Sequence, residues 1–162
     1  MLTLYTMRNV STGSGAHSSV LIDAPSQRII FDPAGSFRHS TIPERNDVLF
    51  GVTPQVEAYY VSYHARETYY VLGQSIQVSD AVAEQAINLA LDNGPVAQSF
   101  CTNATSRLLR RLPGLGAVPQ TFFPNTLAKG FSRLPGVTTR EWHENDPDNK
   151  VLALAEIEMQ MR

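Results

Sequence analysis

"HSSVLIDAPSQRIIFD" runs from His17 to Asp32 and indicates how the first part of the chain folds. Residues 17–23 and 27–32 are rich in Val, Ile, Leu and Phe, and the sequence DAPS separates them. Aliphatic β-branched and aromatic residues favour strands, while Asp, Pro and Ser favour a turn, so this stretch predicts a β-hairpin. Because the two strands of a hairpin run antiparallel, we expect His17 and Asp32 to lie side by side at its open end.

Three flanking segments extend this pattern. Residues 2–7 (LTLYTM) alternate apolar and polar side chains as a strand does, and residues 68–78 (TYYVLGQSIQV) are the best candidate for a central strand. Between them, residues 53–65 (TPQVEAYYVSYHA) predict a helix with Thr53 as N-cap and Pro54 at its first position. The β-branched and aromatic content of that segment leaves a strand open as an alternative.

Helix signals dominate the second half of the chain. Ser79 is a favourable N-cap for the segment 80–93, which has apolar residues at helical spacing, and Gly94 closes it. A second helix is predicted to begin at Cys101 and to end before Pro113.

The remaining segments are less regular. Residues 33–47 predict an irregular loop, residues 124–136 a short helix and residues 142–150 an acidic surface loop, whereas residues 151–162 fit either a helix or a strand. Strands come first and helices later, which predicts an α+β fold with a mostly antiparallel sheet packed against helices. We expect residues 1–162 to form a single domain.

Composition excludes several classes of protein. With 43% hydrophobic and 17% charged residues, the chain is expected to be globular rather than disordered. A formal net charge of −2 gives no electrostatic footprint for nucleic acid. No apolar run approaches the ~20 residues of a membrane span, and the first residues, MLTLYTMRNVSTGSG, do not have the pattern of a signal peptide. A single cysteine excludes an internal disulfide.

That cysteine, Cys101, occupies a position that can support nucleophilic chemistry. The unpaired N–H groups and the positive dipole end at a helix N-terminus lower a thiol pKa from ~8.5 and can hold an oxyanion. The alternative is that Cys101 packs as a small apolar side chain. It shares the predicted inward face of its helix with four other residues, namely Thr105, Leu108, Leu109 and Leu112.

A thiol nucleophile needs a base, and the base needs a group that orients it. His17 opens a strand after a glycine-rich loop, and Asp32 ends the partner strand, so the carboxylate could hold the imidazole tautomer. The other histidines have simpler explanations: His39 as a surface residue, His64 as the end of a helix and His143 as a solvated residue of the acidic loop.

Three motifs together resemble a known family. A histidine in "AHSSVLID", an aspartate in "IIFDPAG" and a cysteine opening a helix in "FCTNATSRLLRRLPG" are similar to the circularly permuted papain-like cysteine hydrolases. That group includes relatives of the NlpC-type cell-wall peptidases and of the lecithin:retinol acyltransferase-like enzymes. The resemblance covers residues 17–136, and the order of histidine, aspartate and then cysteine is that of the permuted branch.

The resemblance implies Cys101 as nucleophile, His17 as base and Asp32 as orienter, without a cofactor. In acyltransferase-like members the third residue is often histidine and follows the first more closely, so Asp32 departs from that pattern. The implied substrates are peptides, with peptidoglycan stem peptides as the leading candidate, or acyl small molecules. A peptidoglycan substrate would place the protein in the periplasm or cell envelope. The small polar residues around Cys101 favour a peptide; they are Ser99, Thr102, Asn103 and Thr105.

Two alternatives remain open. One is a lipid acyltransferase or thioesterase with the same fold. The other is a non-catalytic module that binds glycans or peptides on a tyrosine-rich surface; the tyrosines concerned are Tyr59, Tyr60, Tyr63, Tyr69 and Tyr70. The sequence has no CxxC or HExxH motif, so we expect no metal site.

Overall fold

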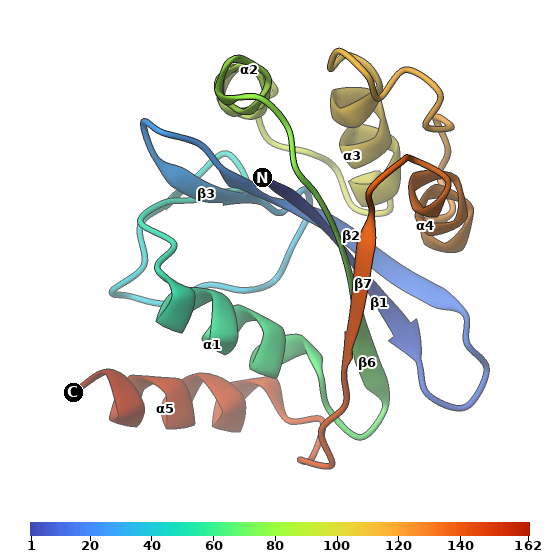
Figure 1. Ribbon diagram of the computed structural model, residues 1–162. Coiled ribbons are helices and arrows are strands. Elements are labelled where there is room, and N and C mark those ends of the chain that lie inside the picture. The colour runs from blue at the N-terminus through green and yellow to red at the C-terminus, as the bar shows by residue number, and fades with distance from the viewer.

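A seven-stranded antiparallel sheet forms the centre of the protein, and the computed structural model describes it over residues 1–162 (Figure 1). The strands lie in the order β4-β5-β3-β2-β1-β6-β7, and every pairing is antiparallel. The strands are β1 (Leu2–Asn9), β2 (Gly15–Asp23), β3 (Arg28–Phe31), β4 (Glu44–Arg45), β5 (Val48–Leu49), β6 (Tyr69–Ile76) and β7 (Thr138–Trp142).

Five helices cover the sheet, with α2, α3 and α4 on one face and α1 and α5 on the other (Figure 1). They are α1 (Pro54–His64), α2 (Asp80–Asp92), α3 (Cys101–Arg110), α4 (Pro124–Ser132) and α5 (Lys150–Met161). The α+β class and the antiparallel sheet predicted from the sequence are therefore confirmed. None of these helices combines the length and the hydrophobicity needed to cross a bilayer.

The predicted hairpin is present as β2 and β3. Val20 pairs with Phe31 and Asp23 with Arg28, so the turn lies at the DAPS sequence. β2 continues on the N-terminal side of Val20, where β1 pairs with it but β3 does not. One edge of β2 is thus open at the segment that contains His17.

Local capping chemistry places the helices as expected. The Thr53 side chain accepts a hydrogen bond from the backbone N–H of Val56 at the start of α1, with Pro54 as the first residue. Ser79 does the same for Val82 at the start of α2. A cap of this kind stabilises a helix by about 1 kcal/mol because it satisfies a backbone donor that has no partner within the helix.

Each face of the sheet has its own apolar core. On one side, Leu4 and Val20 of the sheet pack with Leu108 of α3 and Phe131 of α4. On the other side, Tyr5, Leu21 and Ile30 pack with α1 and α5. Side chains alternate between the faces along a strand, so successive residues of β2 belong to different cores.

Four elements differ from the sequence-based expectations. The prediction of an irregular loop over residues 33–47 was wrong in part, because the short strand β4 lies within it and pairs with the equally unpredicted β5, which in turn pairs with β3. Strands of two residues are too short for an alternating pattern to show in the sequence. Strand β7 occupies a segment for which no strand was predicted, because its residues TTREW are mostly exposed and lack an apolar alternation. It pairs with β6, so β6 is an interior strand. The last residues, left open between helix and strand, form α5, of which only Ala153 and Ile157 are buried.

Candidate functional site

His17 and Asp32 form an ion pair at the open end of the hairpin. Nε2 of His17 lies 2.6 Å from Oδ1 of Asp32. The Asp32 side chain is completely buried, and the His17 side chain is 17% exposed. Because Nε2 faces the carboxylate, Nδ1 is the ring nitrogen that remains for a second partner.

Helix α1 holds the carboxylate of this pair from below the sheet. The Tyr60 hydroxyl donates a hydrogen bond to Oδ1 of Asp32 at 2.9 Å and also lies 2.7 Å from Oγ of Ser19. Ser19 is two residues from His17 on β2, so its side chain is on the same face of the sheet. The tyrosine therefore connects the strand that carries the histidine with Asp32, the residue that follows β3.

A tight loop encloses the other oxygen of Asp32. Ala34 adopts the left-handed backbone conformation with φ of 57°, and the backbone N–H of Gly35 donates to the Asp32 carbonyl at 3.0 Å. A Cβ atom on Gly35 would lie only 1.8 Å from Oδ2 of Asp32. Oδ2 is buried without a hydrogen-bond partner. Only a glycine at position 35 leaves room for the carboxylate in this orientation.

Cys101 is the first residue of α3 and lies beside β2. Hydrogen bonds join the helix to the strand next to both groups of interest: Oγ1 of Thr102 lies 2.9 Å from Oγ of Ser18, and Thr105 donates to the Ser18 carbonyl at 3.5 Å. Ser99 precedes the helix in the left-handed conformation, with φ of 72°. The residues that follow Cys101 and His17 are thus bonded to each other, which fixes the separation of the thiol and the ring.

The start of α3 also has backbone N–H groups without hydrogen-bond partners in the helix. Its first helical hydrogen bond is from the N–H of Ala104 to the carbonyl of Phe100, and no side chain caps the helix. The N–H groups of its first turn are therefore available to a negative charge next to Cys101.

The thiol and the imidazole shift each other's pKa. Burial would raise the pKa of the Cys101 thiol, but the adjacent His17 ring and the Ser18 backbone N–H lower it to about 7. Burial would lower the pKa of His17, but the Asp32 charge, together with smaller effects of Cys101, raises it to about 10. The one contact of the sulfur that has hydrogen-bond geometry is with Oγ1 of Thr102, at 3.7 Å. The ring and the thiol are thus neighbours rather than a fully formed hydrogen-bonded pair, as is common in a resting site.

These values favour a charged pair. Between about pH 7 and pH 10 the thiolate of Cys101 and the imidazolium of His17 coexist. Burial would raise the pKa of the Asp32 carboxyl, but the His17 charge and hydrogen bond hold it below its usual range. A thiolate beside an imidazolium that a carboxylate orients is suited to acyl transfer.

His64 is a member of the site that the sequence analysis missed. Its ring stacks parallel to that of His17, with centroids 6.1 Å apart and an interplanar angle of 8°. Burial, as the largest effect, lowers the pKa of His64 to about 3. It follows Tyr60 by one helical turn, so both residues share a face of α1. The helical spacing alone does not show which face of α1 is turned toward His17, so the sequence carries no signal for this role of His64.

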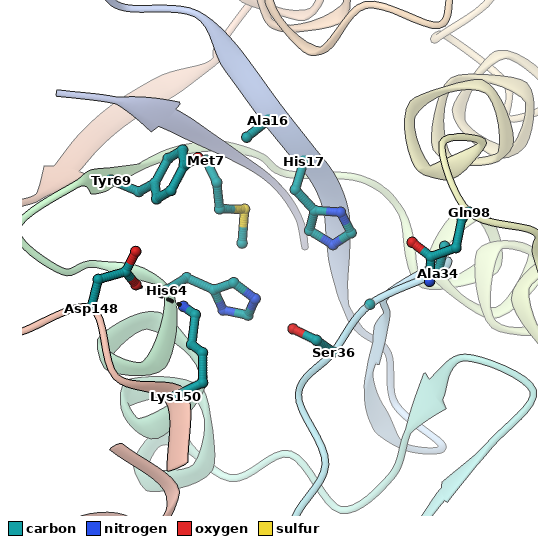
Figure 2. A pocket seen from close by; sticks show the side chains of 11 residues that line it. Met7, Ala16, His17, Ala34, Ser36, His64, Tyr69, Gln98, Asp148 and Lys150 are labelled. Carbon is teal, nitrogen blue, oxygen red and sulfur yellow. Dashed lines mark ion pairs between the residues drawn. The ribbon is translucent and has the colours of Figure 1, made fainter. Parts of the chain in front are cut away.

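A cleft of about 290 Å³ opens beside the two histidines (Figure 2). Ala16 and His17 of β2 form one wall and His64 of α1 another. Asp148, which precedes α5, and Lys150, its first residue, also line the cleft (Figure 2). Gln98, three residues before Cys101, also reaches the cleft. A substrate bound there would lie next to the ring of His17.

Other residues considered in the sequence lie elsewhere. Tyr59, Tyr60 and Tyr63 are buried and so do not form an exposed stacking surface. His143 is exposed and stacks on Tyr70, with centroids 4.6 Å apart. No group of three His, Cys, Asp or Glu side chains is arranged to hold a metal ion.

Comparison of the chain with protein-family models, with curated proteins and with solved structures finds no match.

Proposed function

We propose that the protein is a cysteine hydrolase with a circularly permuted papain-like fold, which cleaves an amide bond in a peptide. In this proposal Cys101 is the nucleophile, His17 the general acid and base, and Asp32 the residue that orients the ring. The observation that carries it is the ion pair between His17 and the buried Asp32 carboxylate, beside an uncapped helix start whose first residue is Cys101 and which is hydrogen-bonded to the strand of His17.

Acylation of the thiol follows from the charge states. The Cys101 thiolate attacks the carbonyl carbon of the substrate, a C–S bond forms, and the carbonyl electrons move to oxygen. The free N–H groups at the start of α3 are placed to stabilise that oxyanion. When the tetrahedral intermediate collapses, the C–N bond breaks and the leaving amine takes a proton from Nδ1 of His17.

Hydrolysis then restores the enzyme. His17, now neutral, accepts a proton from water, and the water oxygen bonds to the acyl carbon. The C–S bond breaks and returns the thiolate, while His17 retains the proton. Asp32 stays ionised throughout and holds Nε2–H, so that Nδ1 always faces the reacting atoms.

A polar peptide is the favoured substrate, with peptidoglycan stem peptides as the leading candidate. Polar groups lie close to the reacting atoms: Oγ1 of Thr102 contacts the sulfur, and Gln98 lines the cleft. His17 and Lys150 add positive charge to the same cleft, and Asp148 adds negative charge. Charged and hydrogen-bonding groups suit a peptide better than a fatty acyl chain.

The test compares wild type with Cys101→Ala on two classes of substrate. Purified muropeptides and phospholipid vesicles would be incubated with each protein, and the products followed by mass spectrometry. Arg110→Ala, an exposed change at the far end of α3, is the matched control and should behave as wild type. We expect cleavage of muropeptide amide bonds that depends on Cys101.

Other outcomes would separate the alternatives. Release of fatty acid that depends on Cys101, with muropeptides intact, would keep the mechanism and replace the substrate. If the protein binds glycans but forms no product that depends on Cys101, the proposal of an enzyme is wrong and a binding module is favoured.

A further inference from the structure

His64 presents a hydrogen-bond acceptor to the cleft that no group of the protein uses. The residue is 7% exposed, and it lines the cleft together with His17. Figure 2 shows the far edge of its ring directed into the space between His17 and Ser36. The only hydrogen bond of the ring is made by its other nitrogen, Nδ1, to the carbonyl of Tyr60 at 2.7 Å.

This hydrogen bond determines what Nε2 can do. A carbonyl oxygen only accepts, so Nδ1 must carry the proton and donate it to Tyr60. The neutral ring then has a lone pair on Nε2 and no proton there. Burial and the nearby charge of His17 keep the ring neutral, because both lower its pKa. Nε2 is thus a fixed acceptor at any pH at which the enzyme would act.

Two neighbouring polar groups in the cleft, Lys150 and Ser36, already have partners within the protein. Lys150 donates to the carbonyl of Tyr63 at 2.6 Å and its Nζ lies 4.3 Å from the centroid of the Tyr63 ring. Oγ of Ser36 lies 3.1 Å from the Tyr63 hydroxyl. These contacts tie Lys150 and Ser36 to the protein, whereas the acceptor on His64 is left for the substrate.

We propose that Nε2 of His64 accepts a hydrogen bond from an amide N–H of the substrate, so that the cleft selects acyl groups that carry such an N–H near the reacting carbonyl. A lone pair in a fixed position attracts an N–H and repels a carbonyl, ester or carboxylate oxygen. The centroids of the His17 and His64 rings are 6.1 Å apart, which lies within the roughly 7 Å that two extended amino-acid residues span. This inference rests on the proposed function, since it concerns the substrate of the same site.

The experiment uses two esters that differ at one atom. N-acetylglycyl p-nitrophenyl ester has an N–H where acetoxyacetyl p-nitrophenyl ester has an oxygen. Rates of Cys101 acylation would be measured from p-nitrophenol release and from the mass of the acylated protein. Each rate would be divided by the rate of the same ester with free cysteine, which removes the difference in intrinsic reactivity.

We expect wild type to prefer the N–H ester by about tenfold after this correction, the value of one neutral hydrogen bond. His64→Phe keeps a flat aromatic ring but has no acceptor, so the preference should fall to about one. His64→Gln retains an acceptor oxygen and should keep part of the preference. Far-UV circular dichroism and a urea unfolding curve of each variant report whether it is folded.

The experiment distinguishes a failure of the proposed function from a failure of the role proposed for His64. If Cys101→Ala releases p-nitrophenol as fast as wild type, the proposed function fails and the inference fails with it. If Cys101 is acylated but wild type prefers neither ester, the proposed function stands and the role of His64 is overturned. The wild-type ratio alone decides this, even if a His64 variant does not fold.

Discussion

Nε2 of His17 and Oδ1 of Asp32 are 2.6 Å apart, although 15 residues separate them in the chain. The hairpin turn brings them together, and the Tyr60 hydroxyl holds the same carboxylate oxygen from helix α1. The carboxylate has no access to solvent, so its charge acts on the imidazole with little screening. The charge states of the site follow from this pair, and they can be measured without knowing the substrate.

The first prediction concerns the rate at which iodoacetamide alkylates Cys101. The rate should be half-maximal near pH 7, because the adjacent His17 ring lowers the pKa of the thiol to about 7. His17→Gln should move the midpoint to about 8.5 or above, the value of an unperturbed thiol. His143→Gln, an exposed histidine outside the site, should leave it unchanged. Labelling only after denaturation would show that Cys101 is buried packing.

The second prediction concerns the charge of Asp32. Asp32→Asn removes the negative charge that raises the pKa of His17, so the ring becomes neutral at a lower pH. The thiolate then loses its cation, and the midpoint of alkylation should rise by about one pH unit or more. Asp92→Asn, an exposed change at the end of α2, is the control. An unchanged midpoint in Asp32→Asn would mean that another group sets the charge of His17.

The third prediction concerns stability in weakly alkaline solution. At about pH 8 the native pair holds one proton, on His17, and the unfolded chain also holds one, on the thiol, so the free energy of unfolding depends little on pH. In Cys101→Ala only His17 of the pair titrates. Because its pKa is higher in the native state, its protonation contributes fully to the free energy of unfolding below about pH 6.5, and this contribution is lost as the pH rises toward about 10. The variant should therefore lose about 1.4 kcal/mol per pH unit near pH 8.

Urea unfolding of both proteins at several pH values measures these slopes. The double variant Cys101→Ala, His17→Gln should again be nearly independent of pH, because neither group remains. Equal slopes in wild type and Cys101→Ala would contradict the thiolate–imidazolium pair.

The fourth prediction concerns the space around Asp32. Gly35→Ala should destabilise the protein by about 2 kcal/mol, because its Cβ would lie 1.8 Å from Oδ2 and the carboxylate would have to move. Displacement of Asp32 should also slow alkylation of Cys101 at about pH 7. Gly116→Ala is the matched control, since nothing lies within 4 Å of its Cβ position. A stable Gly35→Ala protein with wild-type alkylation would show that the loop adapts.

The fifth prediction concerns acid conditions and His64. Its folded pKa, lowered by burial to about 3, lies below the unfolded value of about 6.5, so stability is lost as pH falls through this interval. His64→Phe has no group to protonate and should lose up to about 1.4 kcal/mol less per pH unit between about pH 6 and pH 4. Unfolding curves at those pH values measure the difference. If the free energy of unfolding changed with pH in the same way in wild type and in His64→Phe, His64 would have to be charged or exposed in the native state.

Much of the fold could be predicted from local signals. The hairpin followed from its apolar segments and its DAPS turn, and α1 and α2 from Thr53, Pro54 and Ser79, because capping and turn chemistry act over a few residues. Strand β7 could not be predicted this way. It owes its place to β6 and to Trp142, which packs over Gly73 and Tyr5.

The candidate site was predicted in part. A hairpin relates His17 to Asp32 by its register, and a helix start gives Cys101 its environment, so these geometries could be expected from the sequence. The place of His64 could not, because it depends on how α1 packs beneath β2. The permuted papain-like fold and the roles of these residues remain predictions.

The site draws on three layers of the molecule. The thiol comes from α3 on one face of the sheet, the imidazole and carboxylate from the sheet itself, and part of the cleft wall from the segment that leads into α5 on the opposite face. Helix α5 packs chiefly against α1: Ala153 and Ile157 are buried, Leu154 and Met161 are partly buried, and Lys150 donates a hydrogen bond to the Tyr63 carbonyl. Its position can therefore change without disturbing the hairpin. Selectivity and chemistry can therefore diverge independently: substitutions along α5 would reshape what enters the cleft while the thiol keeps its reactivity.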